Sequence, residues 1–345
     1  MARGLGSLPD EMLSLILGQF CLHCSKACDY DSPDGYFRHA GPQHGHLDQD
    51  PDEPAWYSRN HRKTLNSMCL VSKRFRPLAQ SVLYHEFVLG YGDAWRSTKF
   101  SWNGRLACFV RTIAARPDLA ALVKRVYVHC YLLRPVTEKE AQAALDEVIG
   151  PAAHDYIAHF ERMRGSANKY TTLRIAALEM LGMLLALVPN LERLSIQTEG
   201  PHGSIPASAL STLARLLKTR PLTKLKTLHI CDRFVSFPLG YHANGILETV
   251  ASTGILATLN LHMCFSTTAL QLQRGGLRNM LAVRITHSRL SAGDLASLFD
   301  SYAAPTLKSF VYQAAYPRMD STTCCWVCKF ISLHPFYWIS CYSHS

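Results

Sequence analysis

The segment "LVPNLERLSI", residues 187 to 196, carries the pattern that predicts the fold of this chain. Its last six residues read apolar-x-x-apolar-x-apolar, and the final two apolar positions have the two-residue period of a strand with one buried face. The same order recurs in five other segments: "VKRVYV" at 123 to 128, "LKTLHI" at 225 to 230, "LATLNL" at 256 to 261, "MLAVRI" at 280 to 285 and "LKSFVY" at 307 to 312. We therefore predict a strand in each segment.

The spacing of these segments predicts how the strands are connected. From residue 191 onward they begin 34, 31, 24 and 27 residues apart, close to the roughly 20 to 29 residues of a leucine-rich repeat. A strand followed by a helix, repeated, gives parallel strands with helices on one side. The predicted fold is α/β, a curved leucine-rich-repeat-like solenoid over residues 91 to 318. Amphipathic stretches predict helices at 137 to 149, 170 to 187, 208 to 218, 244 to 252 and 291 to 302.

Two helical stretches precede the repeats. In "SLPDEMLSLILGQF", residues 7 to 20, Pro9 and two acidic residues mark the start of an apolar helix. Between residues 67 and 85 apolar residues recur at three- and four-residue spacing, which predicts one buried helical face. Pro77 is expected to divide this second stretch into two short helices. Its basic cluster of Lys73, Arg74 and Arg76 lies off the apolar stripe, so we predict a solvated face.

Taken in order, "LPDEMLSLIL" at 8 to 17 and "LNSMCLVSKRFRPLAQSVLY" at 65 to 84 resemble the F-box. The F-box is the helical module that docks substrate adaptors onto cullin-RING ubiquitin ligases. The repeat segment "LVPNLERLSI" resembles the repeat of fungal F-box proteins with leucine-rich repeats. In the family a short loop joins the two F-box parts, whereas residues 21 to 62 intervene here. Because the cost of loop closure grows slowly with length, an insertion of this size is compatible with the module.

The resemblance implies an all-α F-box module over residues 1 to 90 that binds a Skp-family linker protein and, through it, a cullin-RING ligase. The protein would then be a substrate-recognition adaptor of an SCF-type (Skp-cullin-F-box) ubiquitin ligase, which acts by proximity and performs no bond chemistry. A scaffold that binds the linker without a cullin has the same sequence features. The resemblance assigns linker binding to Leu8, Pro9, Glu11, Leu13, Ile16, Leu70, Val71 and Phe75.

The predicted strands also offer a surface for a substrate protein. Side chains alternate along a strand, so the residues between the buried apolar positions point to the opposite face. This outward set contains Arg and His but no carboxylate, which predicts an acidic or phosphorylated partner because guanidinium groups pair with both anions. The candidate substrate-binding residues are Arg125, Tyr127, Arg193, His229, Asn260 and Arg284.

Residues 21 to 62 are rich in cysteine and histidine. Cys21 and Cys24 form a Cys-x-x-Cys pair, which is half of a typical zinc site. No second such pair or regularly spaced His pair completes the site, although His44 and His46 are available. The Asp, Pro, Gly and His content predicts a disordered surface loop. We therefore assign no metal ligand and no cofactor.

The charge distribution and the absence of known catalytic motifs argue against two other classes of function. The net charge of +10 is spread without a run of five basic residues, and aromatic side chains interleaved with Lys or Arg are scarce. A basic, zinc-bearing nucleic-acid-binding protein is therefore the less favoured alternative, and no nucleic acid is expected as a partner. No nucleophile elbow, P-loop or zinc-protease motif occurs, so we do not expect an enzyme.

Hydropathy and cysteine usage indicate the compartment. The longest apolar run, at 175 to 189, contains a Glu and is shorter than the roughly 20 residues of a membrane helix, so no membrane association is expected. No signal sequence is recognisable, and the twelve cysteines then indicate a reducing cytoplasmic or nuclear location. Residues 319 to 345 have neither repeat period nor helical pattern and are predicted to form an irregular tail.

Overall fold

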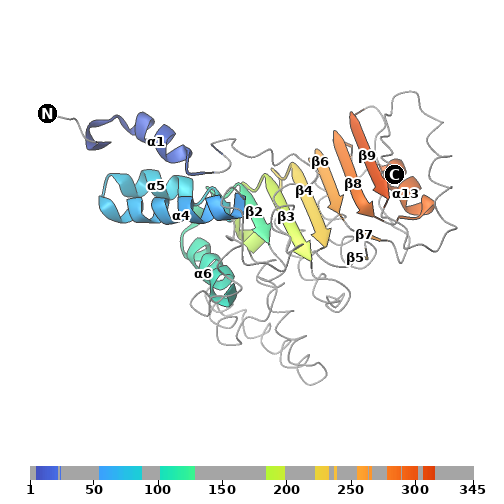
Figure 1. Cartoon of the computed structure of the whole chain (residues 1–345), viewed down its shortest axis with the longest axis horizontal. Helices are drawn as coiled ribbons and strands as arrows, with labels where there is room; N and C mark the ends of the chain where they lie inside the picture. The colour runs from blue at the N-terminus through green and yellow to red at the C-terminus, as the bar shows by residue number, and fades with distance from the viewer. Residues whose placement is uncertain are drawn as a thin grey trace, which may run out of the picture.

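The computed structural model describes residues 5–21, 24, 54–87, 102–128, 184–198, 222–232, 237–238, 255–262, 264–265, 278–288, 290–301 and 306–314. These residues form a mixed α/β structure with a seven-stranded parallel sheet. Figure 1 shows helices near the N-terminus beside one end of the sheet, and the strands following one another in a row toward the other end. The predicted α/β class is confirmed. The helices predicted at 137 to 149, 208 to 218 and 244 to 252, and the tail, lie outside the described residues.

All six predicted strands belong to the large sheet, in an order that follows the chain. The strands are β1 (Glu86–Phe87), β2 (Arg125–Val128), β3 (Arg193–Thr198), β4 (Thr227–Asp232), β6 (Thr258–His262), β8 (Ala282–Ser288) and β9 (Ser309–Ala314). Strand β1 was not predicted, because two residues at the end of the second helical stretch show no period. Two short strands, β5 (Phe237–Pro238) and β7 (Cys264–Phe265), form a separate parallel pair.

The apolar positions of the repeated pattern form continuous buried rows across the sheet. The second apolar position aligns from strand to strand, and its side chains are almost fully buried: Val126, Leu194, Leu228, Leu259 and Val283. The first apolar position is equally buried ahead of β2, β3, β4, β6 and β8, at Val123, Leu191, Leu225, Leu256 and Met280, whereas Leu307 ahead of β9 is half-buried. Burial of one such side chain stabilises the fold by about 1.5–3 kcal/mol. The rows explain why the same spacing recurs in the sequence.

Each strand also begins with the same backbone arrangement. The carbonyl of the residue before a strand accepts hydrogen bonds from two consecutive amides of the next strand segment. His85 O accepts from Lys124 N at 2.9 Å and from Arg125 N at 3.1 Å, and Glu192 O accepts from Lys226 N and Thr227 N at 2.9 and 3.1 Å. Because this arrangement repeats with the pattern, it keeps neighbouring strands in one register.

The N-terminal part is a helical module with its own small core. It contains a 3₁₀ turn, η1 (Leu5–Ser7), and helices α1 (Asp10–Gly18), α4 (Pro54–Val71) and α5 (Phe75–Leu83). Side chains from all three α-helices or the turn after α1 meet in the interior: Leu17, Cys21, Leu65, Cys69, Ala79 and Val82. Figure 1 shows α1 lying beside the α4–α5 pair.

Two predictions about this module need correction. The break in the second helical stretch lies at residues 72 to 74, before Pro77, which instead occupies the first turn of α5. That turn tolerates proline because its amide would have no intrahelical acceptor. The predicted loop at 21 to 62 is also too long, since α4 already begins at Pro54 and Cys21 is buried in the module core.

Three further helices and a helical turn at residues 184 to 187 are described. Helices α6 (Trp102–Ala115) and α7 (Pro117–Ala120) were not predicted, and Phe109 of α6 stacks on Phe87 of β1 with ring centroids 4.3 Å apart. Helix α13 (Ala292–Ser301) confirms the helix predicted from residue 291, and residues 184 to 187 are helical within the predicted 170 to 187 stretch. Across the described ranges, none of the helices combines the length and the apolar character that crossing a membrane requires.

Candidate functional site

Apart from Leu5 of η1, the exposed large apolar side chains of the helical module gather at two places. On α1 they are Met12, Leu15 and Ile16, whose three- and four-residue spacing places them on one side of the helix. At the end of α4 they are Leu70 and Val71, which are 75% and 65% exposed. Contiguous exposed apolar groups of this kind are typical of surfaces that bind a partner protein.

The residues predicted to bind the linker divide into a surface set and an interior set. Pro9, Glu11, Ile16, Leu70 and Val71 are exposed and Leu8 is half-buried. Leu13 and Phe75 are buried, with Leu13 only 2% exposed. The expectation that these two side chains lie on a binding surface is therefore wrong, because α1 and α5 turn them into the protein interior. Sequence reasoning missed Leu15, although its spacing from Met12 could have indicated it.

Arg74 ties the start of α1 to the turn between α4 and α5. Its guanidinium donates to the carboxylate Oδ1 of Asp10 from Nε at 2.9 Å and from Nη2 at 2.7 Å. It also donates to the backbone carbonyls of Gly6 and Leu8, each at 2.5 Å. Arg74 is nevertheless exposed, as are Lys73 and Arg76, so the predicted solvated face of this basic cluster is confirmed. The contacts of Arg74 with the start of α1 were not predicted. The ion pair therefore ties the first residue of α1 to the turn that follows Leu70 and Val71.

The candidate substrate-binding residues lie on one face of the sheet, as predicted. Strand register aligns Tyr127, Ser195, His229, Asn260 and Arg284 in one row across five strands. Arg125 and Arg193 pair in the adjacent row. In a further row, His262 Nδ1 lies 2.8 Å from Thr286 Oγ1. The alternation of side chains therefore gathers polar groups from separate repeats.

The exposure of this face differs from the prediction. Arg193, His229 and Asn260 are buried, at 6%, 5% and 4% exposure, whereas Arg125 and Arg284 are half-buried. The expectation of an open face is therefore wrong for the three central residues. Burial, together with the smaller effects of the nearby charges of His262 and Arg193, lowers the pKa of His229 to about 3. His229 is accordingly neutral at physiological pH.

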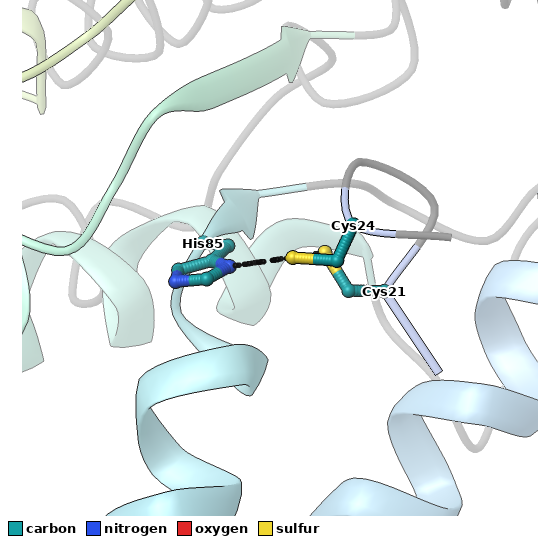
Figure 2. Close-up of side chains that lie close together, drawn as sticks. All are labelled: Cys21, Cys24 and His85. Atoms are coloured by element: carbon teal, nitrogen blue, oxygen red, sulfur yellow. Dashed lines mark hydrogen bonds between the residues drawn. The ribbon is translucent and has the colours of Figure 1, made fainter. Parts of the chain in front are cut away.

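A third group joins the helical module to the sheet. Cys21 and Cys24 follow α1, and His85 lies between α5 and β1. Figure 2 shows the two sulfur atoms turned toward the imidazole ring. Cys24 Sγ lies 3.3 Å from His85 Nδ1, Cys21 Sγ lies 3.9 Å from the same nitrogen, and all three atoms lie within 4.8 Å of one another. Cys21 Sγ also donates to Glu86 Oε1 at 3.5 Å.

The environment of these thiols is partly apolar and partly anionic. Cys21 is buried, while Cys24 and His85 are half-buried. The pKa of the Cys21 thiol is raised by its hydrogen bond with the Cys24 side chain, and further by burial and by the Glu86 carboxylate. The thiols are not joined in a disulfide. Sequence reasoning found the cysteine pair but missed His85, which is 61 residues from Cys24, while His44 and His46 lie outside the described residues.

Two comparisons with known proteins identify no relative of this chain. A scan against models of known protein families gives no match for this chain, and a search of curated proteins gives none either.

Proposed function

We propose that this protein is a substrate-recognition adaptor of an SCF-type ubiquitin ligase, with an F-box-like module that binds a Skp-family linker and a leucine-rich-repeat-like domain that binds the substrate. The observation that carries the proposal is the exposure of Ile16, Leu70 and Val71 at positions where the sequence resembles the F-box. An isolated protein gains nothing from placing such side chains in water. A partner that covers them would gain about 25 cal/mol for each Å² of apolar surface removed from water.

The sheet supports the second half of the proposal. Its strand order follows the chain, and the repeated turn before each strand is what stacked repeats of one supersecondary unit produce. A substrate would contact the polar face through its accessible members, Arg125 and Arg284, instead of through the buried centre. Two half-buried guanidinium groups favour an acidic or phosphorylated segment.

The decisive experiment measures binding of the purified full chain to a purified Skp-family linker. The variant Leu70→Ser/Val71→Ser removes two exposed apolar side chains, and Leu281→Ser is the matched control because Leu281 is an exposed apolar residue next to β8. We expect the double variant to bind the linker at least tenfold more weakly, which is about 1.4 kcal/mol, and the control to bind as the unmodified protein does. Absence of linker binding by the unmodified protein, or equal binding by all three proteins, contradicts the proposal.

A further inference from the structure

The group formed by Cys21, Cys24 and His85 has the dimensions of a metal site. In a tetrahedral zinc site, Zn–S bonds of about 2.3 Å and Zn–N bonds of about 2.0–2.1 Å place sulfur and nitrogen ligands about 3.5 Å apart. The sulfur atoms of Cys24 and Cys21 lie 3.3 and 3.9 Å from His85 Nδ1, on either side of that value. Small rotations of the side chains would make both separations equal.

The two sulfur atoms and the imidazole nitrogen also lie closer together than the packing of buried thiols in a protein core requires. A buried cysteine is most often a small apolar side chain with no partner of its own. Cys69 is such a residue, since it lies in the same core but does not belong to the group of mutually close donor atoms. Cys21 and Cys24, in contrast, approach one imidazole nitrogen from a Cys-x-x-Cys segment that is distant in sequence from it.

We propose that Cys21, Cys24 and His85 bind a zinc ion through Cys21 Sγ, Cys24 Sγ and His85 Nδ1. Water or Glu86, whose Oε1 lies 3.5 Å from Cys21 Sγ, takes the fourth position. Two thiolates and a neutral imidazole balance the charge of Zn²⁺, so binding releases the two thiol protons to solvent. His85 keeps its remaining proton on Nε2. Two soft sulfur ligands and one imidazole select zinc over the oxygen-preferring Mg²⁺ and Ca²⁺.

The position of this site gives the ion a structural role. Cys21 lies three residues after the end of α1, His85 directly precedes β1, and Glu86 is the first residue of that strand. Arg62 of α4 donates to the carbonyl of Glu86 at 2.8 Å, so α4 already contacts the same strand. Metal–ligand bonds to zinc would connect the segment after α1 to the first strand of the sheet. The helical module and the sheet would then be held together at the point where the chain passes from one to the other.

The first test measures zinc bound to the purified full chain by elemental analysis and by cobalt(II) substitution. Because the chain has twelve cysteines, the result is read as the difference between proteins. The variant Cys21→Ser/Cys24→Ser should bind one ion fewer than the unmodified protein and lose one set of thiolate-to-cobalt absorption bands. His85→Gln should weaken binding at least tenfold, and Cys69→Ala should bind as the unmodified protein does. Equal metal content in the unmodified protein and the double-serine variant overturns the proposal.

A second test needs no substitution that affects folding. The unmodified protein is stripped with a chelator under reducing conditions and titrated with zinc in buffers of different ionisation enthalpy. Binding at this site should release two protons per ion and raise the melting temperature, and Mg²⁺ should do neither. Failure of zinc to bind, or binding without proton release, overturns the proposal. So does a Cys21–Cys24 disulfide, detected by mass spectrometry of protein purified without reductant, if reduction does not restore zinc binding.

Discussion

Arg74 and Asp10, 64 residues apart in the chain, form an ion pair with Nη2 of the arginine 2.7 Å from Oδ1 of the aspartate. Both side chains are about half exposed, so the charge interaction alone contributes little. The arginine also holds the carbonyls of Gly6 and Leu8, and hydrogen bonds from a charged donor are stronger than those between neutral groups. The planar guanidinium therefore fixes the chain that leads into α1.

Replacement of this arginine tests the connection. Arg74→Ala should lower the free energy of unfolding by about 1 kcal/mol, since one exposed ion pair and the hydrogen bonds to two backbone carbonyls are lost. Arg74→Lys should restore only part of it, because a lysine cannot form the same fork of hydrogen bonds. Urea denaturation measures both values. Lys73→Ala, which removes the adjacent exposed charge, is the control and should change stability by less than about 0.5 kcal/mol.

Leu13 and Leu15 separate folding from partner binding within one helix. Leu13→Ala removes a buried side chain and should lower stability by about 2–5 kcal/mol. Leu15 is 65% exposed, so Leu15→Ala should leave the melting temperature nearly unchanged. If α1 contributes to linker binding as proposed, Leu15→Ala weakens that binding while the fold is intact. A loss of stability for Leu15→Ala equal to that of Leu13→Ala would contradict the assigned orientation of α1.

The strands could be predicted from the sequence because their signal is local. In "LKTLHI" and "LATLNL" all three apolar side chains within six residues are buried, and the two segments align position by position in adjacent strands. The helix break was misplaced because proline is compatible with the first turn of a helix. The choice of residues 72 to 74 depends on local hydrogen bonds, such as that from Phe75 N to Ser72 Oγ at 3.1 Å, which spacing does not reveal.

The candidate sites depend on contacts that no local pattern contains. Cys21 meets His85, and Asp10 meets Arg74, only after α1 has packed against α5. The face of the sheet was predicted correctly from alternation, but its exposure was not. Alternation says which side of a strand a residue takes, whereas burial of Arg193 and His229 depends on what else covers that side.

Helix α13 offers a test of capping. Ser291 Oγ accepts from Asp294 N at 3.1 Å, while Asp294 Oδ2 accepts from the Ser291 amide at 2.9 Å and from the Ser291 hydroxyl. This reciprocal arrangement satisfies amides that the helix itself leaves without acceptors. Ser291→Ala should lower the free energy of unfolding by about 1 kcal/mol. Ser291→Thr, which keeps a hydroxyl that can accept from the Asp294 amide and donate to its carboxylate, should cost less in the same denaturation experiment.

His229 makes stability depend on pH. Its pKa is about 3 in the folded protein and about 6.5 in an unfolded chain. Between these values the unfolded state binds more protons, so stability falls as the pH is lowered below about 6.5, by up to about 1.4 kcal/mol per pH unit. Above about 6.5 this contribution no longer changes. His229→Gln should flatten the profile, measured by urea denaturation from pH 7 to pH 4, whereas equal slopes for both proteins would contradict a neutral buried histidine.

Arg193 and Arg284 carry the same charge on the same face of the sheet, yet charge reversal should affect them differently. Arg193 is 6% exposed, so Arg193→Glu places a carboxylate in a site built around a cation and should lower stability by about 3 kcal/mol or more. Arg284 is half-buried, and Arg284→Glu should cost about 1 kcal/mol or less.

Only the Arg284 variant can therefore report on substrate binding. The fold of each variant is checked first. Arg284→Glu should then reduce the capture of acidic or phosphorylated peptides from a library. The reduction should be largest at low salt, because attraction between exposed charges is least screened there. Arg284→Gln should show about half of that reduction if charge is the cause. Peptide capture that is the same for all three proteins at low salt would show that the polar face of the sheet does not bind the substrate.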